Sequence, residues 1–150
     1  MDGTGMCHDR QAVVAAARQW LGTPYHHQAS LCGVGTDCLG LVRGVYRALY
    51  GREAALVPGY TRDWAEAARQ ETLLMAARLH LLETDLSGAK AGDVVIFRWR
   101  RGMAAKHAAI LCGEQKMIHA IEGARVSEVA FSPWWRRRLA GAFSFPGTIE

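Results

Sequence analysis

The sequence GTDCLGLV, at residues 35–42, carries the chain from a loop into a helix and places a cysteine at the boundary. Residues 22–36 are rich in glycine and polar side chains, which is typical of a loop. Apolar residues then recur at helical spacing: Leu41, Val42, Val45, Tyr46 and Leu49. We therefore predict a helix over residues 38–50, ended by Gly51, with Cys38 in its first turn.

The position of Cys38 favours a nucleophilic thiol. The first turn of a helix presents unpaired N–H groups and partial positive charge, which stabilise a thiolate. A lowered thiol pKa is the main requirement for a cysteine nucleophile, so we expect the pKa of Cys38 to be depressed. Gly40 follows closely and would let another part of the chain approach the helix backbone. Position alone also fits a small buried apolar residue, as many free cysteines are.

The rest of the chain divides into helices followed by short strands. Residues 9–21, with Asp9 as N-cap, and residues 63–82 have helical patterns. Five short apolar runs follow, separated by turn signals: residues 94–97, 107–111, 117–120, 125–129 and 142–145. This order predicts an α+β fold, with the N-terminal helices packed against an antiparallel sheet of about five strands. No linker or repeat interrupts residues 1–150, so we expect a single domain.

Two histidines on neighbouring predicted strands are candidates for a base and its orienting partner. A nucleophilic thiol needs a base, normally histidine, and a third group that fixes the tautomer of the imidazole. His107 begins one strand and His119 lies on the next, with Gly113 at the turn between them. An antiparallel hairpin would set both imidazoles on one face. We predict that His107 is the base and His119 its orienter; the alternative is a pair of core histidines with satisfied hydrogen bonds.

The loop before Cys38 holds further candidates. Tyr25 could donate a hydrogen bond to a developing oxyanion, together with the backbone N–H of Cys38. We place four further residues on the substrate-binding side of the site: His26, His27, Asp37 and Lys106. No fourth ligand joins His26, His27 and Cys32 at a standard zinc spacing, so we expect no metal, and no cofactor is implied.

The composition limits the classes of molecule that the protein can be expected to bind. The formal charge is +4, and arginine gathers with tryptophan at residues 98–101 and 134–138. Such clusters meet anionic polymers or an acidic partner, or form a solvated basic face with tryptophan beneath; no nucleic-acid recognition motif accompanies them. No apolar run approaches the ~20 residues of a membrane span, so we expect no membrane partner. Residues 1–8 lack the pattern of a secretory signal, which predicts synthesis in the cytoplasm with reduced cysteines.

Five blocks of sequence, in order, resemble the NlpC family of cysteine peptidases, which have a papain-like fold. The blocks are residues 21–25, 37–42, 92–97, 107–110 and 117–120, and the likeness runs from about residue 10 to 146. The resemblance implies that Cys38 is the nucleophile, His107 the base, His119 the third member of the triad and Tyr25 an oxyanion-side residue. It also implies cleavage of peptidoglycan stem peptides at the γ-D-glutamyl–diaminopimelate bond, through a thioester.

The chain departs from the family pattern in the region that is expected to bind the substrate. Leu39 replaces a usual serine, residues 26–28 replace a glycine pair, and residues 31–35 look like added loop. Four segments are similar to a narrower branch, the NlpC-type peptidases encoded with tail genes of phages and gene transfer agents: residues 26–31, 97–100, 106–111 and 133–138. That likeness implies delivery by a particle, with tail hub proteins as partners and the periplasmic cell wall as the place of action.

Other functions share the same predicted site. An N-acetylmuramoyl-L-alanine amidase or an acyltransferase of this fold would use an identical triad. A structural tail component would keep the fold for docking, and the tryptophan–arginine clusters would suit its interface, because both residue types are favoured interface anchors. The retention of Cys38, His107 and His119 together favours a hydrolase over that last alternative.

Overall fold

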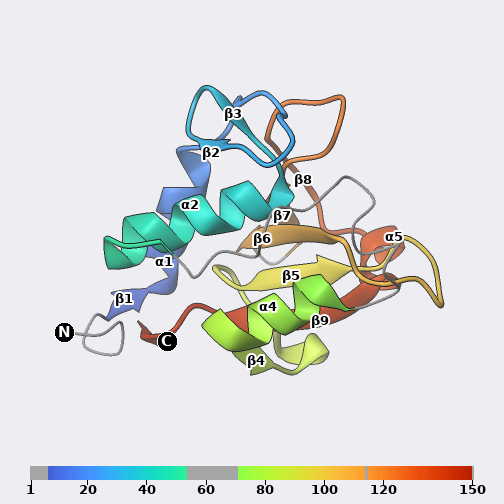
Figure 1. The fold of residues 1–150 in the computed structure, drawn as a ribbon. Helices are drawn as coiled ribbons and strands as arrows, with labels where there is room; N and C mark the ends of the chain where they lie inside the picture. The colour runs from blue at the N-terminus through green and yellow to red at the C-terminus, as the bar shows by residue number, and fades with distance from the viewer. Residues whose placement is uncertain (1–6, 54–70, 114, 150) are drawn as a thin grey trace.

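A computed structural model of the chain describes residues 7–53, 71–113 and 115–149 (Figure 1). Its helices are α1 (Arg10–Arg18), α2 (Cys38–Tyr50), α4 (Thr72–His80), the 3-10 turn η2 (Leu86–Gly88) and α5 (Pro133–Arg136). Its strands are β1 (His8–Asp9), β2 (Ser30–Leu31), β3 (Gly35–Thr36), β4 (Leu82–Thr84), β5 (Val94–Phe97), β6 (His107–Gly113), β7 (Lys116–His119), β8 (Ser127–Ala130), β9 (Leu139–Ser144) and β10 (Thr148–Ile149). The predicted α+β class is confirmed.

The main sheet has six antiparallel strands in the order β4-β9-β5-β6-β7-β8. The five predicted strands are all present, and β4 at the edge is the sixth, pairing Leu82 with Ser144. The helix predicted over residues 63–82 ends earlier, at His80. The backbone of Leu81 is extended and leads into β4, and the Leu81 side chain is buried. Residues 63–70 of that prediction lie outside the described residues.

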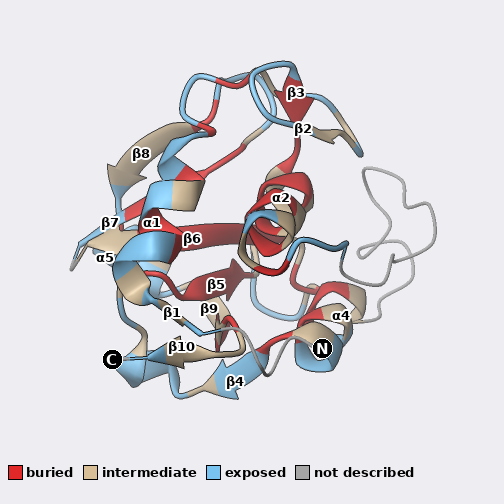
Figure 2. Cartoon of the chain, turned by 90° about the vertical axis from the view of Figure 1, so that its left-hand side faces the viewer, coloured by how far each residue is buried: buried red, intermediate tan, exposed pale blue. Residues whose placement is uncertain are grey.

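The helices α1 and α2 pack together over one face of the sheet, where both contact β6, and Figure 2 shows buried residues along β5 and β6 and on part of α2. Fully buried side chains from the two layers, such as Val13, Val45 and Ile110, form this main core. A smaller cluster, including Phe97, Met117 and Phe131, covers the opposite face. Burial of apolar side chains on both faces stabilises the central strands and holds the strand ends in fixed places.

Both N-terminal helices start where the sequence predicts. The side chain of Asp9 accepts a hydrogen bond from the N–H of Ala12 at 2.7 Å, so it is the N-cap of α1. The helix stops at Arg18 instead of continuing to residue 21, since the chain turns at Gly22, whose φ is +88° and whose N–H binds the carbonyl of Val126. The bounds of α2 agree with the predicted residues 38–50, and Gly51 ends it in a left-handed conformation.

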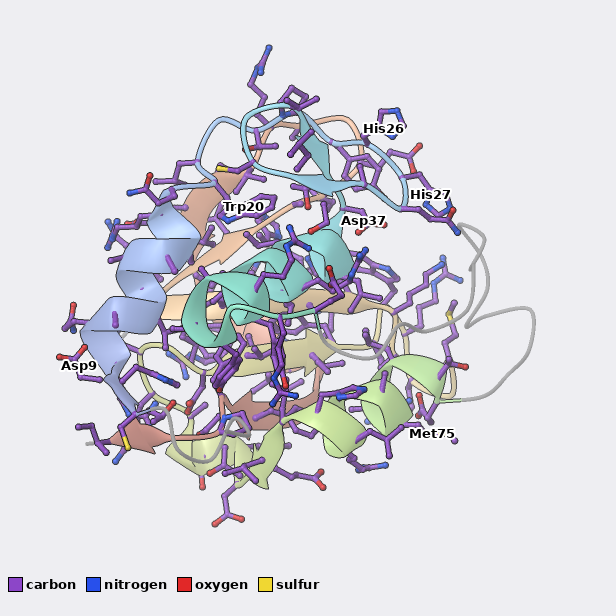
Figure 3. The ribbon with its side chains drawn as sticks, turned by 60° about the vertical axis from the view of Figure 1, so that its left-hand side comes forward. Asp9, Trp20, His26, His27, Asp37 and Met75 are labelled. Atoms are coloured by element: carbon purple, nitrogen blue, oxygen red, sulfur yellow. The ribbon has the colours of Figure 1, made fainter. Side chains whose placement is uncertain are left out.

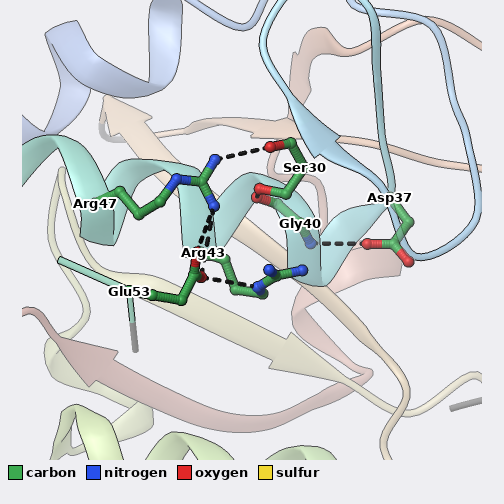
Figure 4. A network of polar contacts seen from close by, with 6 residues as sticks. All are labelled: Ser30, Asp37, Gly40, Arg43, Arg47 and Glu53. Atoms are coloured by element: carbon green, nitrogen blue, oxygen red, sulfur yellow. Dashed lines mark hydrogen bonds and ion pairs between the residues drawn. The ribbon is translucent and has the colours of Figure 1, made fainter. Parts of the chain in front are cut away.

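A small hairpin, β2–β3, packs on the first turns of α2. A Cβ atom on Gly40 would lie 2.0 Å from the carbonyl oxygen of Ala29, so only glycine lets the hairpin approach so closely. Arg47 donates to the carbonyl of Ser30 at 2.8 Å, and the hydroxyl of Ser30 donates to the carbonyl of Gly40 at 2.6 Å (Figure 4). The segment that precedes Cys38 is therefore held against the helix at several points.

The first and last described strands pair in parallel, away from the hairpin. His8 lies opposite Thr148, and the imidazole Nε2 of His8 is 2.8 Å from the hydroxyl of Thr148. Figure 1 shows β1 and β10 side by side at one end of the molecule, with α5 and the loop between β5 and β6 at the other. No helix among the described residues is long and apolar enough to cross a membrane.

Candidate active site

Cys38 is the first residue of α2, and Asp37 fixes that position. One carboxylate oxygen of Asp37 accepts the N–H of Gly40 at 2.7 Å, which is the contact of an N-cap (Figure 4). The other oxygen accepts the N–H of Gln28 at 2.8 Å. The buried carboxylate thus starts the helix and ties the preceding loop to it. The predicted substrate-binding role of Asp37 stays a prediction.

The pKa of Cys38 is raised to about 12, so the expectation of a depressed pKa is wrong. Burial of the thiol has the largest effect, and the negative charge of Asp37 adds to it. The backbone N–H groups of Ala108, Leu39 and Cys38 itself oppose both. The helix start therefore does stabilise the thiolate, as predicted, but less strongly than burial and the capping carboxylate destabilise it. The resting side chain is a neutral thiol.

The thiol of Cys38 faces the start of β6. Its Sγ donates to the carbonyl oxygen of Lys106 at 3.9 Å, and the N–H of Ala108 also contributes at this position. These two residues flank His107 in the chain, so the sulfur lies against the backbone on either side of the candidate base. The substrate-binding role of the half-buried Lys106 side chain stays a prediction.

The structure brings the two candidate histidines together. The Nε2 of His107 lies 2.9 Å from the Nδ1 of His119, within hydrogen-bond distance, and both side chains are buried. Strands β6 and β7 pair with Ile110 opposite Ile118, which places the histidines diagonally across the ladder on one face. Because His119 engages Nε2, the Nδ1 of His107 is the nitrogen left to exchange a proton with a nucleophile.

Burial keeps both imidazoles neutral. Burial and, as a smaller contribution, the neighbouring His119 together lower the pKa of His107 to about 3. Burial also lowers the pKa of His119. A neutral thiol next to a neutral imidazole pair is the resting state that follows, so the proton must leave Cys38 when the thiol attacks rather than beforehand.

Two tryptophans pack on this pair, and sequence reasoning assigned them no role in the site. Trp99 stacks on His107 with ring centroids 5.1 Å apart, and Trp135 of α5 stacks on it at 5.4 Å. Trp135 also meets His119 edge-on at 5.5 Å, so one ring touches both imidazoles. Both tryptophans lie in the arginine-rich segments, which was the only signal in the sequence. They exclude water from the histidines and fix the plane of His107.

The loop that carries Trp99 is held by a carboxylate. Glu71, just before α4, forms an ion pair with Arg98 and accepts the N–H of Ala105 at 2.8 Å. Burial acts to raise the pKa of Glu71, but these two contacts prevail and lower it. The carboxylate therefore stays charged and fixes both ends of the segment between β5 and His107.

Tyr25 and its neighbours lie on the loop beside the start of α2. A β-bridge joins Tyr25 to Thr36, and the N–H of Thr36 donates to the carbonyl of Pro24 at 3.0 Å, so the loop runs next to the residues that precede Cys38. His26 is exposed and His27 half-buried. Figure 3 shows His26 and His27 at the outer edge of this loop, beyond Asp37. The oxyanion role of Tyr25 and the substrate contacts of the two histidines stay predictions.

Among residues 7–53, 71–113 and 115–149, no group of three His, Cys, Asp or Glu side chains is arranged to hold a metal ion. The described cysteines are unpaired: Cys7, Cys32, Cys38 and Cys112. What the site offers chemically is a thiol, a proton acceptor held by a second imidazole, and backbone N–H groups at a helix start. Those are the components of acyl transfer by a cysteine nucleophile.

Residues 22–144 match the family model described as NlpC/P60. The structure is similar to the NlpC/p60 domain of the peptidoglycan hydrolase SagA, with 27% identity and a TM-score of 0.67, covering 92% of this chain and 100% of that one. No curated protein matches the sequence.

Longer proteins contain the same fold. An NlpC/P60 family protein from Bacillus cereus matches with 21% identity and a TM-score of 0.66, covering 93% of this chain and 41% of that one. A lipoprotein-like NLP/P60 family protein from Staphylococcus aureus matches with 22% identity and a TM-score of 0.60, covering 97% of this chain and 45% of that one. The chain thus spans all of the SagA domain but less than half of these two proteins.

The lowered pKa of His107 makes stability depend on pH. Between about pH 6.5 and pH 3 the unfolded chain binds a proton at this residue that the folded protein does not. The free energy of unfolding should therefore fall as the pH falls through this window. His107→Gln should reduce that dependence by up to about 1.4 kcal/mol per pH unit. Urea unfolding at several pH values checks this, with the exposed His26→Gln as control; equal slopes for both variants would contradict it.

Removal of the Trp135 ring should expose both imidazoles. We expect Trp135→Ala to raise the pKa of His107 from about 3 toward 6.5, because burial is the main cause of its lowering. NMR titration of the imidazole resonances measures this directly. Trp134→Ala is the matched control: of the rings that the structure describes, Trp134 contacts Trp99 and Trp135 but neither histidine. An unchanged His107 titration in Trp135→Ala would show that the ring does not shield the pair.

Proposed function

Because its residues 22–144 match the family model, this chain belongs to the NlpC/P60 family, and on that premise we propose that it is a cysteine endopeptidase of peptidoglycan. The observation that carries the proposal is the buried hydrogen bond between His107 and His119, next to the strand backbone that Cys38 contacts. A base held by a second imidazole beside a thiol is the arrangement that nucleophilic catalysis needs.

In the proposed reaction the thiol of Cys38 attacks the carbonyl carbon of the scissile amide. The S–H bond breaks as the S–C bond forms, and the proton passes to the Nδ1 of His107. Because the thiol has a raised pKa and the imidazole a lowered one, charge separates only at this step. His119 fixes the tautomer and orientation of His107 and stabilises the imidazolium through the 2.9 Å contact.

The negative charge that forms on the former carbonyl oxygen then needs hydrogen-bond donors to stabilise it. We propose the backbone N–H of Cys38 and the hydroxyl of Tyr25, since the loop with Tyr25 runs beside the residues that precede the helix. When the intermediate collapses, the C–N bond breaks and His107 returns its proton to the leaving amine. Water, deprotonated by His107, hydrolyses the thioester and regenerates the thiol.

We propose the γ-D-glutamyl–diaminopimelate bond as the scissile bond. The support is the resemblance of the five sequence blocks to NlpC peptidases and the likeness to a domain whose parent protein is described as a peptidoglycan hydrolase. An amidase that releases the whole stem peptide, or an acyltransferase that passes the thioester to another nucleophile, is the second candidate. Both would use the same three side chains, so the new end group of the product distinguishes them.

We further propose that a phage tail or gene transfer agent particle carries the domain to the periplasmic cell wall. The support is the similarity of residues 26–31, 97–100, 106–111 and 133–138 to that branch of the family. Tail hub proteins would be the partners in such a particle.

Incubation of diaminopimelate-type muropeptides with the protein should release a free diaminopimelate amine, detected by mass spectrometry. Cys38→Ala should release none, because the nucleophile is missing, whereas Cys112→Ala should keep full activity. Release of the intact stem peptide would instead identify an amidase. Hydrolysis by Cys38→Ala would rule out the thiol mechanism.

The two histidines should differ in their effect on rate. His107→Ala should lower kcat about 100- to 10,000-fold, the usual contribution of a general base. His119→Ala should lower it less, and His119→Asn should recover part of the loss, because an amide can still hold the Nε2 of His107. Steady-state kinetics on a synthetic stem peptide measures all three variants. The reverse order of effects would exchange the roles of base and orienter.

A further inference from the structure

Two arginine-rich segments that are far apart in sequence form one surface at the edge of the site. The ring of Trp99 lies 6.4 Å from that of Trp134 and 5.7 Å from that of Trp135, measured between centroids. Figure 1 shows the loop after β5 and the helix α5 together at this end of the molecule. We name this the Trp–Arg surface and define it by six residues: Trp99, Arg100, Arg101, Trp134, Arg137 and Arg138.

The Trp–Arg surface is positively charged and partly apolar. Residues 97–107 and 131–139 contain no acidic residue. Within the described part of the chain, no acidic side chain pairs with the exposed Arg100, Arg101 or Arg137. The tryptophan of the surface that is most open, Trp134, is 43% exposed. The guanidinium of Arg138 lies 3.6 Å from the centroid of the Trp134 ring and also donates a hydrogen bond to the carbonyl of Trp134. The stacked pair places a flat cationic group on this surface.

The surface continues directly into the candidate active site. Trp99 touches Trp134 on one side and stacks on His107 on the other, at 5.1 Å. An extended peptide covers about 3.5 Å per residue, so a chain whose reacting carbonyl lies at Cys38 reaches this surface within a few residues. One extended peptide is therefore long enough to occupy the candidate active site and the Trp–Arg surface together.

We propose that the Trp–Arg surface binds the carboxylates of the stem peptide that flank the scissile bond. The inference rests on the proposed function, because the γ-D-glutamyl and diaminopimelyl residues supply those carboxylates. Arginine matches a carboxylate with two parallel hydrogen bonds, and the tryptophan rings suit the aliphatic part of the same residues. A basic face beside a buried site also concentrates an anionic substrate there, an effect that salt weakens.

The test compares three proteins on a free-acid stem peptide and on the same peptide with its side carboxylates amidated. They are the wild type, the surface variant Arg100→Gln/Arg101→Gln/Arg137→Gln, and a control variant that removes the same charge elsewhere, Arg52→Gln/Lys90→Gln/Lys116→Gln. We expect the surface variant to raise KM for the free acid roughly 3- to 30-fold at low salt, with kcat unchanged. Amidation or 0.5 M salt should raise the KM of the wild type and the control, but have little further effect on the surface variant.

Equal KM values in the surface and control variants, or an equal effect of amidation on all three proteins, would overturn the inference. Binding is measured separately, by tryptophan fluorescence with Cys38→Ala in each of the three backgrounds, so that it does not depend on turnover. Weaker binding of the free acid in the surface background alone supports the inference even if the wild type cuts no peptide. That last result would contradict the proposed function and leave the surface as a binding site.

Discussion

The carboxylate of Asp37 is the constraint on which the candidate site depends. Its two oxygens accept backbone N–H groups from Gly40 inside the helix and Gln28 in the loop, so one buried side chain decides where α2 begins and how the loop lies on it. Burial raises the pKa of the Cys38 thiol most, and the charge of Asp37 adds to that effect, because a negative group next to the thiol disfavours the thiolate. The cap therefore positions the nucleophile at a cost in its ionisation.

The raised pKa of Cys38 determines when the proton must leave the thiol. A thiol and an imidazole that are both neutral cannot rely on a preformed ion pair, so reactivity depends on the geometry in which the proton crosses from Cys38 to His107. The packing of Trp99 and Trp135 matters for this reason, because it holds the imidazole plane and limits the access of water. Preorganised N–H groups and dipoles, whose interaction energy grows as charge develops, then take the place of solvent.

The features that could be predicted from sequence are those that short-range patterns determine. The bounds of α2, the cap at Asp9 and the placing of two histidines on paired strands follow from helical spacing, capping chemistry and turn position. The edge strand β4 was missed because three residues that pair only with β9 carry no periodic signal. The pKa of Cys38 was misjudged because burial arises from tertiary packing, and the contacts of Trp135 join segments that sequence alone does not bring together.

The parallel pairing of β1 with β10 has a consequence for how such a domain can be held. Both strands lie at the end of the molecule away from α5 and the loop that leads to His107 (Figure 1). A polypeptide fused to either strand would leave the domain at the end opposite the loop that leads to His107, so the anchor would lie away from the candidate active site. A short tether there would hold the domain at a high effective concentration near the structure that anchors it, without covering the end of the molecule that carries α5 and the loop before His107.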